Sequence, residues 1–112
     1  MTITWKHYKY WLKDLIQSSL PEEVSPPHPN IISTDTRKIH HSHWFIPLKG
    51  ENFDGHKFIL QSLEEQKVSG VFCEKYFFPN IPSRFQKKVL VVNDTLLALQ
   101  AIARGGEHRI LI

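Results

Sequence analysis

The amino-acid sequence predicts a single α/β domain in which a small, largely parallel or mixed sheet is flanked by helices. Short runs rich in β-branched and aromatic residues alternate with segments of helical periodicity, which is the pattern of layered α/β domains. Residues 89–92 are apolar at every position, as strands buried on both faces of a parallel sheet are. The length of 112 residues is that of one domain with a core of its own.

The chain is expected to begin with a leading helix in residues 1–20 and a connector in residues 21–29. Within residues 4–18, apolar side chains recur at three- and four-residue spacing, which predicts that one face of the helix is buried. The residues on that face are Trp5, Tyr8, Trp11, Leu12, Leu15 and Ile16. Core packing explains these aromatic rings better than base stacking does. Four prolines in residues 21–29 predict a stiff connector.

The core of the domain is expected to comprise residues 30–104. Its strands are predicted at residues 30–34, 44–48, 71–73 and 89–92, where β-branched and aromatic residues gather. Pro47 lies within the second of them. Because proline cannot donate a hydrogen bond to a neighbouring strand, it argues for an edge strand or a bulge at that point.

Two helices are predicted in the same core. Asp54 is a good N-cap for a helix from about residue 55 to residue 66, and its inward side chains are expected to be Phe58, Ile59 and Leu63. Asn93 and Asp94 precede a second helix at residues 95–103, whose core-facing side chains are expected to be Leu96, Leu97, Leu99 and Ile102. Arg104, Gly105 and Gly106 are expected to end that helix, and residues 109–112 to begin a further strand.

Charge and cysteine content narrow the classes of function. The net charge is +3 and the pI about 9.1, but the basic residues are spread out, with no run longer than Lys87-Lys88, so a nucleic-acid partner is not indicated. A phosphate on a small ligand explains mild basicity as well. Cys73 is the single cysteine and is expected to be a small core residue. No stretch resembles a signal peptide or a membrane span, which predicts a cytoplasmic protein.

The first candidate site is formed by Thr34, Asp35, Thr36 and Arg37. These residues follow the first predicted strand, where open α/β sheets tend to bind ligands. Hydroxyl and backbone groups can contact a base or a sugar, and the Arg37 guanidinium can fork onto a phosphate or a carboxylate. A plain turn with an ion pair between Asp35 and Arg37 is the alternative, and the chemistry of the residues leaves both interpretations open.

The second candidate site is the segment from Lys49 to His56, which reads KGENFDGH. Two glycines bracket an acid, an amide and an aromatic ring, which could stack on a base and hydrogen-bond its edge. The alternative is an ordinary loop in front of a capped helix, and the pattern by itself does not decide between them.

A third cluster, His40, His41 and His43, could ligate a metal ion. Adjacent residues of an extended chain point to opposite faces, and no carboxylate or cysteine is close in sequence. Surface histidines are therefore the better interpretation. The chain also has no GxxxxGKS/T phosphate loop and no nucleophile elbow, so it shows no catalytic machinery.

Three motifs in order resemble a known family. STDTR is followed by an aromatic-rich strand leading into LKGENFDGHKFI, and then by VLVVNDTLLALQAIA. Together, over residues 31–103, they closely resemble the N-terminal domain of the Mur ligases, and most of all the members that add D-alanyl-D-alanine. In that family this domain holds the uridine diphosphate end of the precursor, and a following domain carries the ATP site.

The resemblance implies a function for the chain. The chain would bind the UDP end of a UDP-N-acetylmuramoyl-peptide as part of an ATP-dependent ligase that adds D-Ala-D-Ala in bacterial peptidoglycan synthesis. ATP and Mg would belong to a domain outside this sequence, with no cofactor or metal within it, and these residues alone are expected to have no ligase activity. The central ATP-binding and C-terminal ligase domains would be its partners, and residues 105–112 would begin the link to the former.

The resemblance also implies site residues. The UDP contacts would be Thr34, Thr36, Arg37, Lys49, Gly50, Glu51, Asn52 and Phe53, with support from Asp35, Asp54, Gly55, His56 and Asp94. The family usually has a Pro-Gly-Asp turn before the second strand, and here His41-Ser42-His43 replaces it. The sequence also stops before any catalytic domain. A stand-alone, non-catalytic interaction or regulatory module that retains the Mur ligase N-terminal fold is therefore the alternative.

Overall fold

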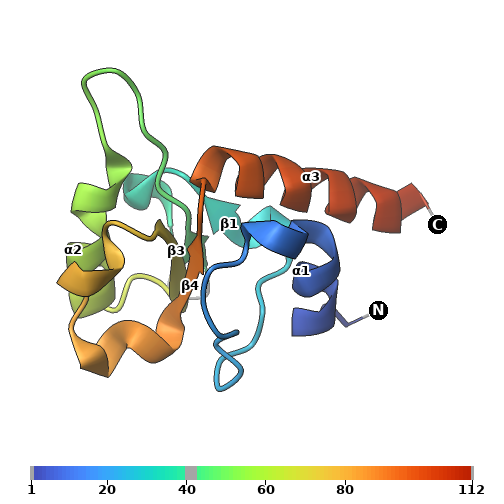
Figure 1. Cartoon of the computed structure of the whole chain (residues 1–112), viewed down its shortest axis with the longest axis horizontal. Helices are drawn as coiled ribbons and strands as arrows, with labels where there is room; N and C mark the ends of the chain where they lie inside the picture. The colour runs from blue at the N-terminus through green and yellow to red at the C-terminus, as the bar shows by residue number, and fades with distance from the viewer. Residues whose placement is uncertain (1, 40–42, 112) are drawn as a thin grey trace.

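The sheet has four parallel strands in the order β1-β2-β3-β4. The computed structural model describes residues 2–39 and 43–111, and for residues 107–111 it describes the backbone alone. The strands are β1 (Ile32–Ser33), β2 (Trp44–Phe45), β3 (Gly70–Glu74) and β4 (Val89–Val92). Helices cover both faces of the sheet (Figure 1), which confirms the predicted fold class.

Alternation of side chains along the strands divides the core into two layers. Trp44, Phe72 and Leu90 point to the face covered by α1 (Trp5–Leu12) and α3 (Thr95–Leu111). The neighbouring residues Phe45, Val71 and Val91 point to the other face. That face is covered by α2 (Ile59–Glu64) and by the 3₁₀ segments η5 (Phe78–Asn80) and η6 (Ser83–Lys88). Strands buried on both faces explain why residues 89–92 are wholly apolar.

The expectation that Pro47 marks an edge strand or a bulge is wrong. The strand β2 lies between β1 and β3 and ends at Phe45, so Pro47 is buried just beyond the strand. The outer edge of β4 is instead covered by the segment after α1. The amide of Gln17 donates to the Val91 carbonyl at 2.8 Å, and the amide of Asn93 donates to the Leu15 carbonyl at 3.0 Å. These hydrogen bonds satisfy a strand edge that would otherwise be open.

The leading helix is shorter than predicted, although its buried face is as expected. It ends at Leu12 because Lys13, its C-cap, adopts a positive φ of 50°, and the 3₁₀ turn η1 (Lys13–Leu15) follows. Trp5, Tyr8 and Leu12 are buried and Trp11, Leu15 and Ile16 are partly buried against the same cluster. Two of these aromatic residues also hold the proline-rich connector. The Trp5 indole donates to the Val24 carbonyl at 2.9 Å, and the Tyr8 hydroxyl donates to the Pro27 carbonyl at 2.5 Å.

The last helix continues where the sequence predicted its end. The helix α3 runs through Gly105 and Gly106 to Leu111, so the strand predicted at residues 109–112 is wrong for the described residues 109–111. A Cβ on Gly105 would lie 2.4 Å from the Cδ1 atom of the Trp11 ring, and one on Gly106 would lie 3.1 Å from Cγ of Pro29. The glycines therefore allow close packing against α1 and the connector. This packing offsets the low helix propensity of glycine.

The inward face of α3 also differs from the prediction. Ala98, Ala101 and Ile102 are buried against the sheet, at the i, i+3, i+4 spacing of one helical stripe. Leu96 and Leu97 were expected in the core but are 50% and 48% exposed. In the described residues, no helix combines the length and the apolar character needed to span a bilayer.

Candidate functional site

A pocket of about 540 Å³ joins two segments that the sequence analysis had singled out separately. It lies where β1 ends and where the 3₁₀ helix η4 (Gly55–Phe58) leads into α2. Its lining residues are Thr34, Asp35, Thr36, Arg37, Phe53, Gly55 and Phe58. The fold thus places the turn at residues 33–37 (STDTR) opposite Phe53, Gly55 and Phe58, which follow residues 49–52 (KGEN).

The turn after β1 is held by its own side chains. The Ser33 hydroxyl accepts a hydrogen bond from the Asp35 amide at 3.1 Å. Asp35 caps the 3₁₀ turn η3 (Thr36–Lys38) by accepting from the Arg37 amide at 2.9 Å. The Arg37 guanidinium then forks onto the same carboxylate, with both contacts at 3.1 Å. These hydrogen bonds lower the pKa of Asp35 to about 2. The ion pair that the sequence allowed is therefore present.

The two threonines of this turn have unused hydrogen-bonding capacity. Thr36 is partly buried and Thr34 is exposed, and both line the pocket. Within the described part of the chain, neither hydroxyl takes part in a side-chain hydrogen bond. A hydroxyl that faces a pocket and has no internal partner can donate to or accept from a bound polar ligand.

The second segment forms a narrow loop that rises from the end of the sheet, drawn in green in Figure 1. The Gly50 amide donates to the Phe53 carbonyl at 2.7 Å, and the Gly55 amide donates to the Leu48 carbonyl at 2.9 Å. Residues 50–53 at the tip are exposed. Of the predicted contacts in this loop, Phe53 lines the pocket, whereas Lys49, Gly50, Glu51 and Asn52 do not.

A lysine missed by the sequence analysis lies beside the pocket. The Phe53 and Phe58 rings pack with their centroids 6.1 Å apart. The Lys57 ammonium lies 5.1 Å from the Phe53 centroid and 5.3 Å from that of Phe58. Cation–π attraction keeps this charge near the pocket. Sequence reasoning had placed Phe58 in the core and gave no role to Lys57, because only the folded loop brings Phe53 next to them.

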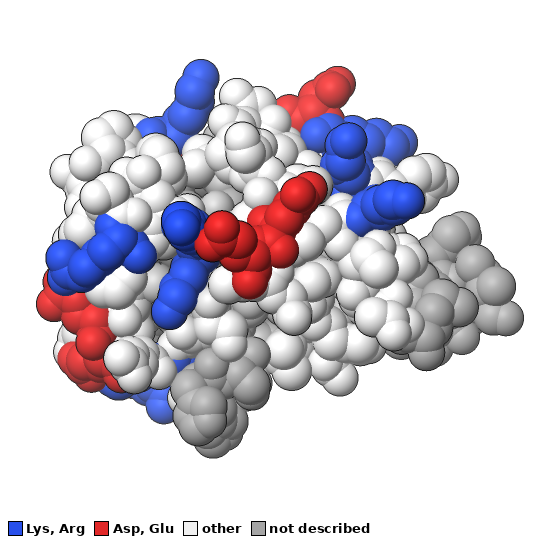
Figure 2. All heavy atoms as spheres, turned by 90° about the horizontal axis from the view of Figure 1, so that it is seen from below, with Lys and Arg blue, Asp and Glu red and all other residues white. Residues whose placement is uncertain are grey.

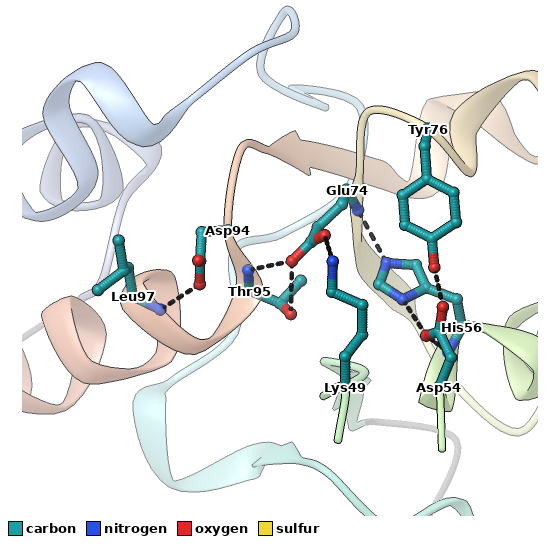
Figure 3. A network of polar contacts seen from close by, with 8 residues as sticks. All are labelled: Lys49, Asp54, His56, Glu74, Tyr76, Asp94, Thr95 and Leu97. Atoms are coloured by element: carbon teal, nitrogen blue, oxygen red, sulfur yellow. Dashed lines mark hydrogen bonds and ion pairs between the residues drawn. The ribbon is translucent and has the colours of Figure 1, made fainter. Parts of the chain in front are cut away.

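A buried carboxylate anchors one stem of the loop (Figure 3). Glu74, at the end of β3, is 6% exposed. Its carboxylate accepts from the Lys49 ammonium at 2.5 Å and from the Thr95 amide at 2.9 Å. Burial acts to raise the pKa of Glu74, but the hydrogen bonds from Lys49 and Thr95 outweigh it, and the pKa is lowered. The Glu74 carboxylate therefore links Lys49, at the base of the loop, to the start of α3.

A buried histidine anchors the other stem (Figure 3). His56 is 1% exposed, and its Nδ1 lies 2.7 Å from an Asp54 carboxylate oxygen. Its Nε2 accepts from the Glu74 amide at 2.9 Å. Since Nε2 accepts, the neutral tautomer with its proton on Nδ1 satisfies both contacts. The Tyr76 hydroxyl also donates to Asp54. Partial burial acts to raise the pKa of Asp54, but the hydrogen bonds from Tyr76 and His56 outweigh it.

The start of α3 is occupied by the protein's own carboxylates. Besides the bond from Thr95 to Glu74, the Leu97 amide donates to Asp94 at 2.9 Å. Asp94 is thus the helix cap that the sequence predicted, as Asp54 is for η4. Helix N-termini often bind anions, but these two amides already have acidic partners.

Charge on the surface is mixed. Figure 2 shows one face of the molecule, and on the described residues of this face acidic side chains lie among basic ones without a continuous basic stripe. Within the described ranges, no group of three or more His, Cys, Asp or Glu residues could hold a metal ion. His40 and His41 lie outside the described residues, and the carbonyl of His43 accepts from the Ser69 amide at 2.8 Å. Cys73 is buried, and burial raises its pKa to about 12, so it is the core residue predicted.

The chain is similar to ligases that share one name. The UDP-N-acetylmuramoyl-tripeptide–D-alanyl-D-alanine ligase of Bacillus subtilis (strain 168) is 45% identical over 74 residues, which are 66% of this chain and 15% of that protein. The ligase of the same name from Synechocystis sp. is 37% identical over 83 residues, 74% of this chain and 17% of that protein. That from Haemophilus influenzae is 34% identical over 79 residues, 70% and 16% respectively. The chain is related to the Mur ligases.

The relationship to the Mur ligases is limited to a short segment of them. The matches span 15% to 17% of the length of these relatives, about one small domain. They confirm the resemblance to this family. No protein-family model matches the chain, and neither does any solved structure. The relatives are named for a ligation reaction, and the names alone do not assign a ligand to the pocket.

Proposed function

We propose that this chain binds the uridine diphosphate end of a UDP-N-acetylmuramoyl-peptide, as the N-terminal domain of an ATP-dependent ligase that adds D-alanyl-D-alanine in peptidoglycan synthesis. The observation that carries the proposal is the pocket between residues 34–37 and Phe53, Gly55 and Phe58. It lies in a segment related to ligases named for such a substrate. The UDP end is remote from the peptide that such a ligase extends, so binding here contributes by positioning a long substrate.

The chemistry of the pocket suits a nucleoside diphosphate. The Phe53 ring is 51% exposed and offers a face on which a base can stack. The hydroxyls of Thr34 and Thr36 can hydrogen-bond the base or the ribose. Lys57 supplies a positive charge that lies over the rings of Phe53 and Phe58, and Arg37 adds a guanidinium shared with Asp35. A diphosphate needs cations of this kind.

We do not expect ATP and Mg, which the proposed reaction requires, to bind to the residues of this chain. The sequence contains no GxxxxGKS/T loop to surround a triphosphate, and two amides at the start of α3 already bond to Glu74 and Asp94. In the proposal these groups bind to another part of the parent protein, and the 112 residues have no ligase activity of their own. Phosphate release that copurifies with the 112-residue chain would contradict this.

Titration of the ¹⁵N-labelled chain with UDP and with UDP-N-acetylmuramoyl-tripeptide tests the proposal. We expect saturable changes in the amide resonances of residues 34–37, 50–55 and 58, with weaker changes for UMP, which lacks the second phosphate. ADP is the control for base selectivity, and Thr2→Val is a matched variant outside the pocket. Saturating nucleotide sugar without change at these amides would refute the proposal and favour the alternative of a non-catalytic interaction module.

A further inference from the structure

We propose that Glu74 is a positioning residue for nucleotide binding, because it holds the loop at residues 50–53 in place through Lys49 and His56. This inference rests on the proposed function and adds residues that lie outside the pocket. It also changes the expected role of Lys49, from a contact with the ligand to an ion pair that joins the loop to the end of β3.

The first step of the argument concerns where Lys49 points. Its ammonium lies 2.5 Å from a Glu74 carboxylate oxygen and 5.4 Å from the centroid of the Tyr76 ring, and it does not line the pocket. The Glu74 side chain is 8% exposed, so without Lys49 a buried carboxylate would lose its charged partner. Loss of one partner from such a pair is costly, and the pair therefore persists in the folded domain.

The second step concerns the opposite stem. His56 joins Asp54 at the end of the loop to the backbone amide of Glu74, and Tyr76 donates to the same Asp54. The backbone pairing of Lys49 with Asp54 closes the loop between these anchors. Both stems are thus attached to the end of β3, one through the side chain of Glu74 and one through its amide (Figure 3). Phe53, which lines the pocket, lies one residue before this closure.

The third step is that the tip has few anchors of its own. Residues 50–53 are exposed, and the Gly50 amide bonded to the Phe53 carbonyl is a backbone contact within the loop. Exposed loops with few buried contacts open locally with little free energy. An anchor at the stem therefore determines the fraction of molecules in which Phe53 faces the turn at residues 34–37. If only that arrangement binds ligand, the affinity falls in proportion to its population.

Hydrogen exchange of the ligand-free 112-residue chain tests the anchor directly. In Glu74→Gln the side chain can still accept from Thr95 but no longer carries the charge that holds Lys49. We expect the amides of Gly50 and Gly55 to exchange about tenfold faster, a larger factor than for the Leu90 amide in β4, which reports global unfolding. Lys49→Arg, which preserves the cation, should restore protection relative to Lys49→Met. Unchanged exchange at Gly50 and Gly55 in Glu74→Gln would overturn the proposal, whether or not UDP binds.

A double-mutant cycle with UDP as the probe separates this ion-pair role of Lys49 from a ligand contact. We expect Lys49→Met and Glu74→Gln each to weaken UDP binding about threefold to tenfold, and the double variant to be no weaker than either single one by more than about twofold. Lys67→Met, which breaks an exposed pair with Glu65 at 3.0 Å, is the matched control and should bind like the wild type. Additive losses would show that Lys49 contacts the nucleotide itself, and equal binding by Glu74→Gln and the wild type would exclude a positioning role.

Discussion

The turn at residues 33–37 and the loop at residues 49–56 face the same pocket but are held in different ways. In the turn, the side-chain hydrogen bonds join residues two positions apart. In the loop, His56 and Asp54 are also joined two positions apart, but two further hydrogen bonds reach from Asp54 to Tyr76 and from His56 to Glu74, across 22 and 18 positions. The turn is therefore a local structure, and the loop is ordered only when β3 is in place.

The difference predicts how each half of the site responds to change. A local turn loses little conformational entropy when it forms, whereas contacts between distant residues must offset the entropy of closing the chain between them. Substitutions in the turn should therefore alter affinity with little effect on stability. Substitutions in the anchors of the loop should lower stability and affinity together.

The largest effect is expected from His56→Ala. The variant removes a buried ring, leaves the Glu74 amide without its acceptor and takes one of three donors from Asp54, so the free energy of unfolding should fall by about 2–4 kcal/mol. Urea denaturation measures it. The control is Arg37→Ala in the turn, where the side chain is 86% exposed and no change in midpoint is expected. Similar midpoints for the two variants would show that the two halves do not differ.

Acid should weaken the buried loop anchor and should leave the contribution of the exposed turn to stability unchanged. The pKa of Glu74 is lowered from its ordinary value of 4.5, so its contribution to stability is present above about pH 4.5 and is lost as the pH falls through the folded-state pKa. We expect the melting temperatures of wild type and Glu74→Gln to differ at pH 7 and to converge in acid. The pKa of Asp35 is also low, but this carboxyl belongs to an exposed pair screened by solvent. Asp35→Asn should therefore leave the dependence of melting temperature on pH in the acid range unchanged. A Glu74→Gln melting temperature that falls in parallel with that of the wild type as the pH is lowered would contradict the prediction.

Thr36→Val should produce the opposite signature in the turn. It nearly preserves side-chain volume and removes a hydroxyl that makes no side-chain hydrogen bond within the described residues. We expect UDP affinity to fall by about 0.5–1.5 kcal/mol with no change in melting temperature. Calorimetric titration beside a thermal melt gives both values. Wild-type affinity combined with earlier unfolding would show that the hydroxyl has a structural role.

Lys57→Gln should have the smallest effect, limited to charge. The side chain is exposed and its ammonium lies over the rings of Phe53 and Phe58, so we expect about twofold to fivefold weaker binding of UDP at low salt and less at high salt. Binding of uridine should be unaffected because it carries no phosphate. An equal loss for uridine and UDP would indicate that Lys57 supports the rings and does not contact the diphosphate.

The sequence by itself determined the alternation of strands and helices, the caps Asp54 and Asp94, the buried face of α1 and the turn at residues 33–37. Each of these depends on residues close together in the chain, where hydrogen-bonding reach and side-chain periodicity are readable directly. The ion pair of Asp35 with Arg37 and the core position of Cys73 were accessible for the same reason.

Only the tertiary structure decided how the two halves of the site meet and what holds them. No local pattern shows that Glu74 from β3 binds Lys49, that Tyr76 reaches Asp54, or that Lys57 lies over Phe53. The same limit explains the error at α3. Gly105 has the local signature of a helix end, but it permits a helix to pass close to Trp11, and packing against a distant ring overrides local propensity.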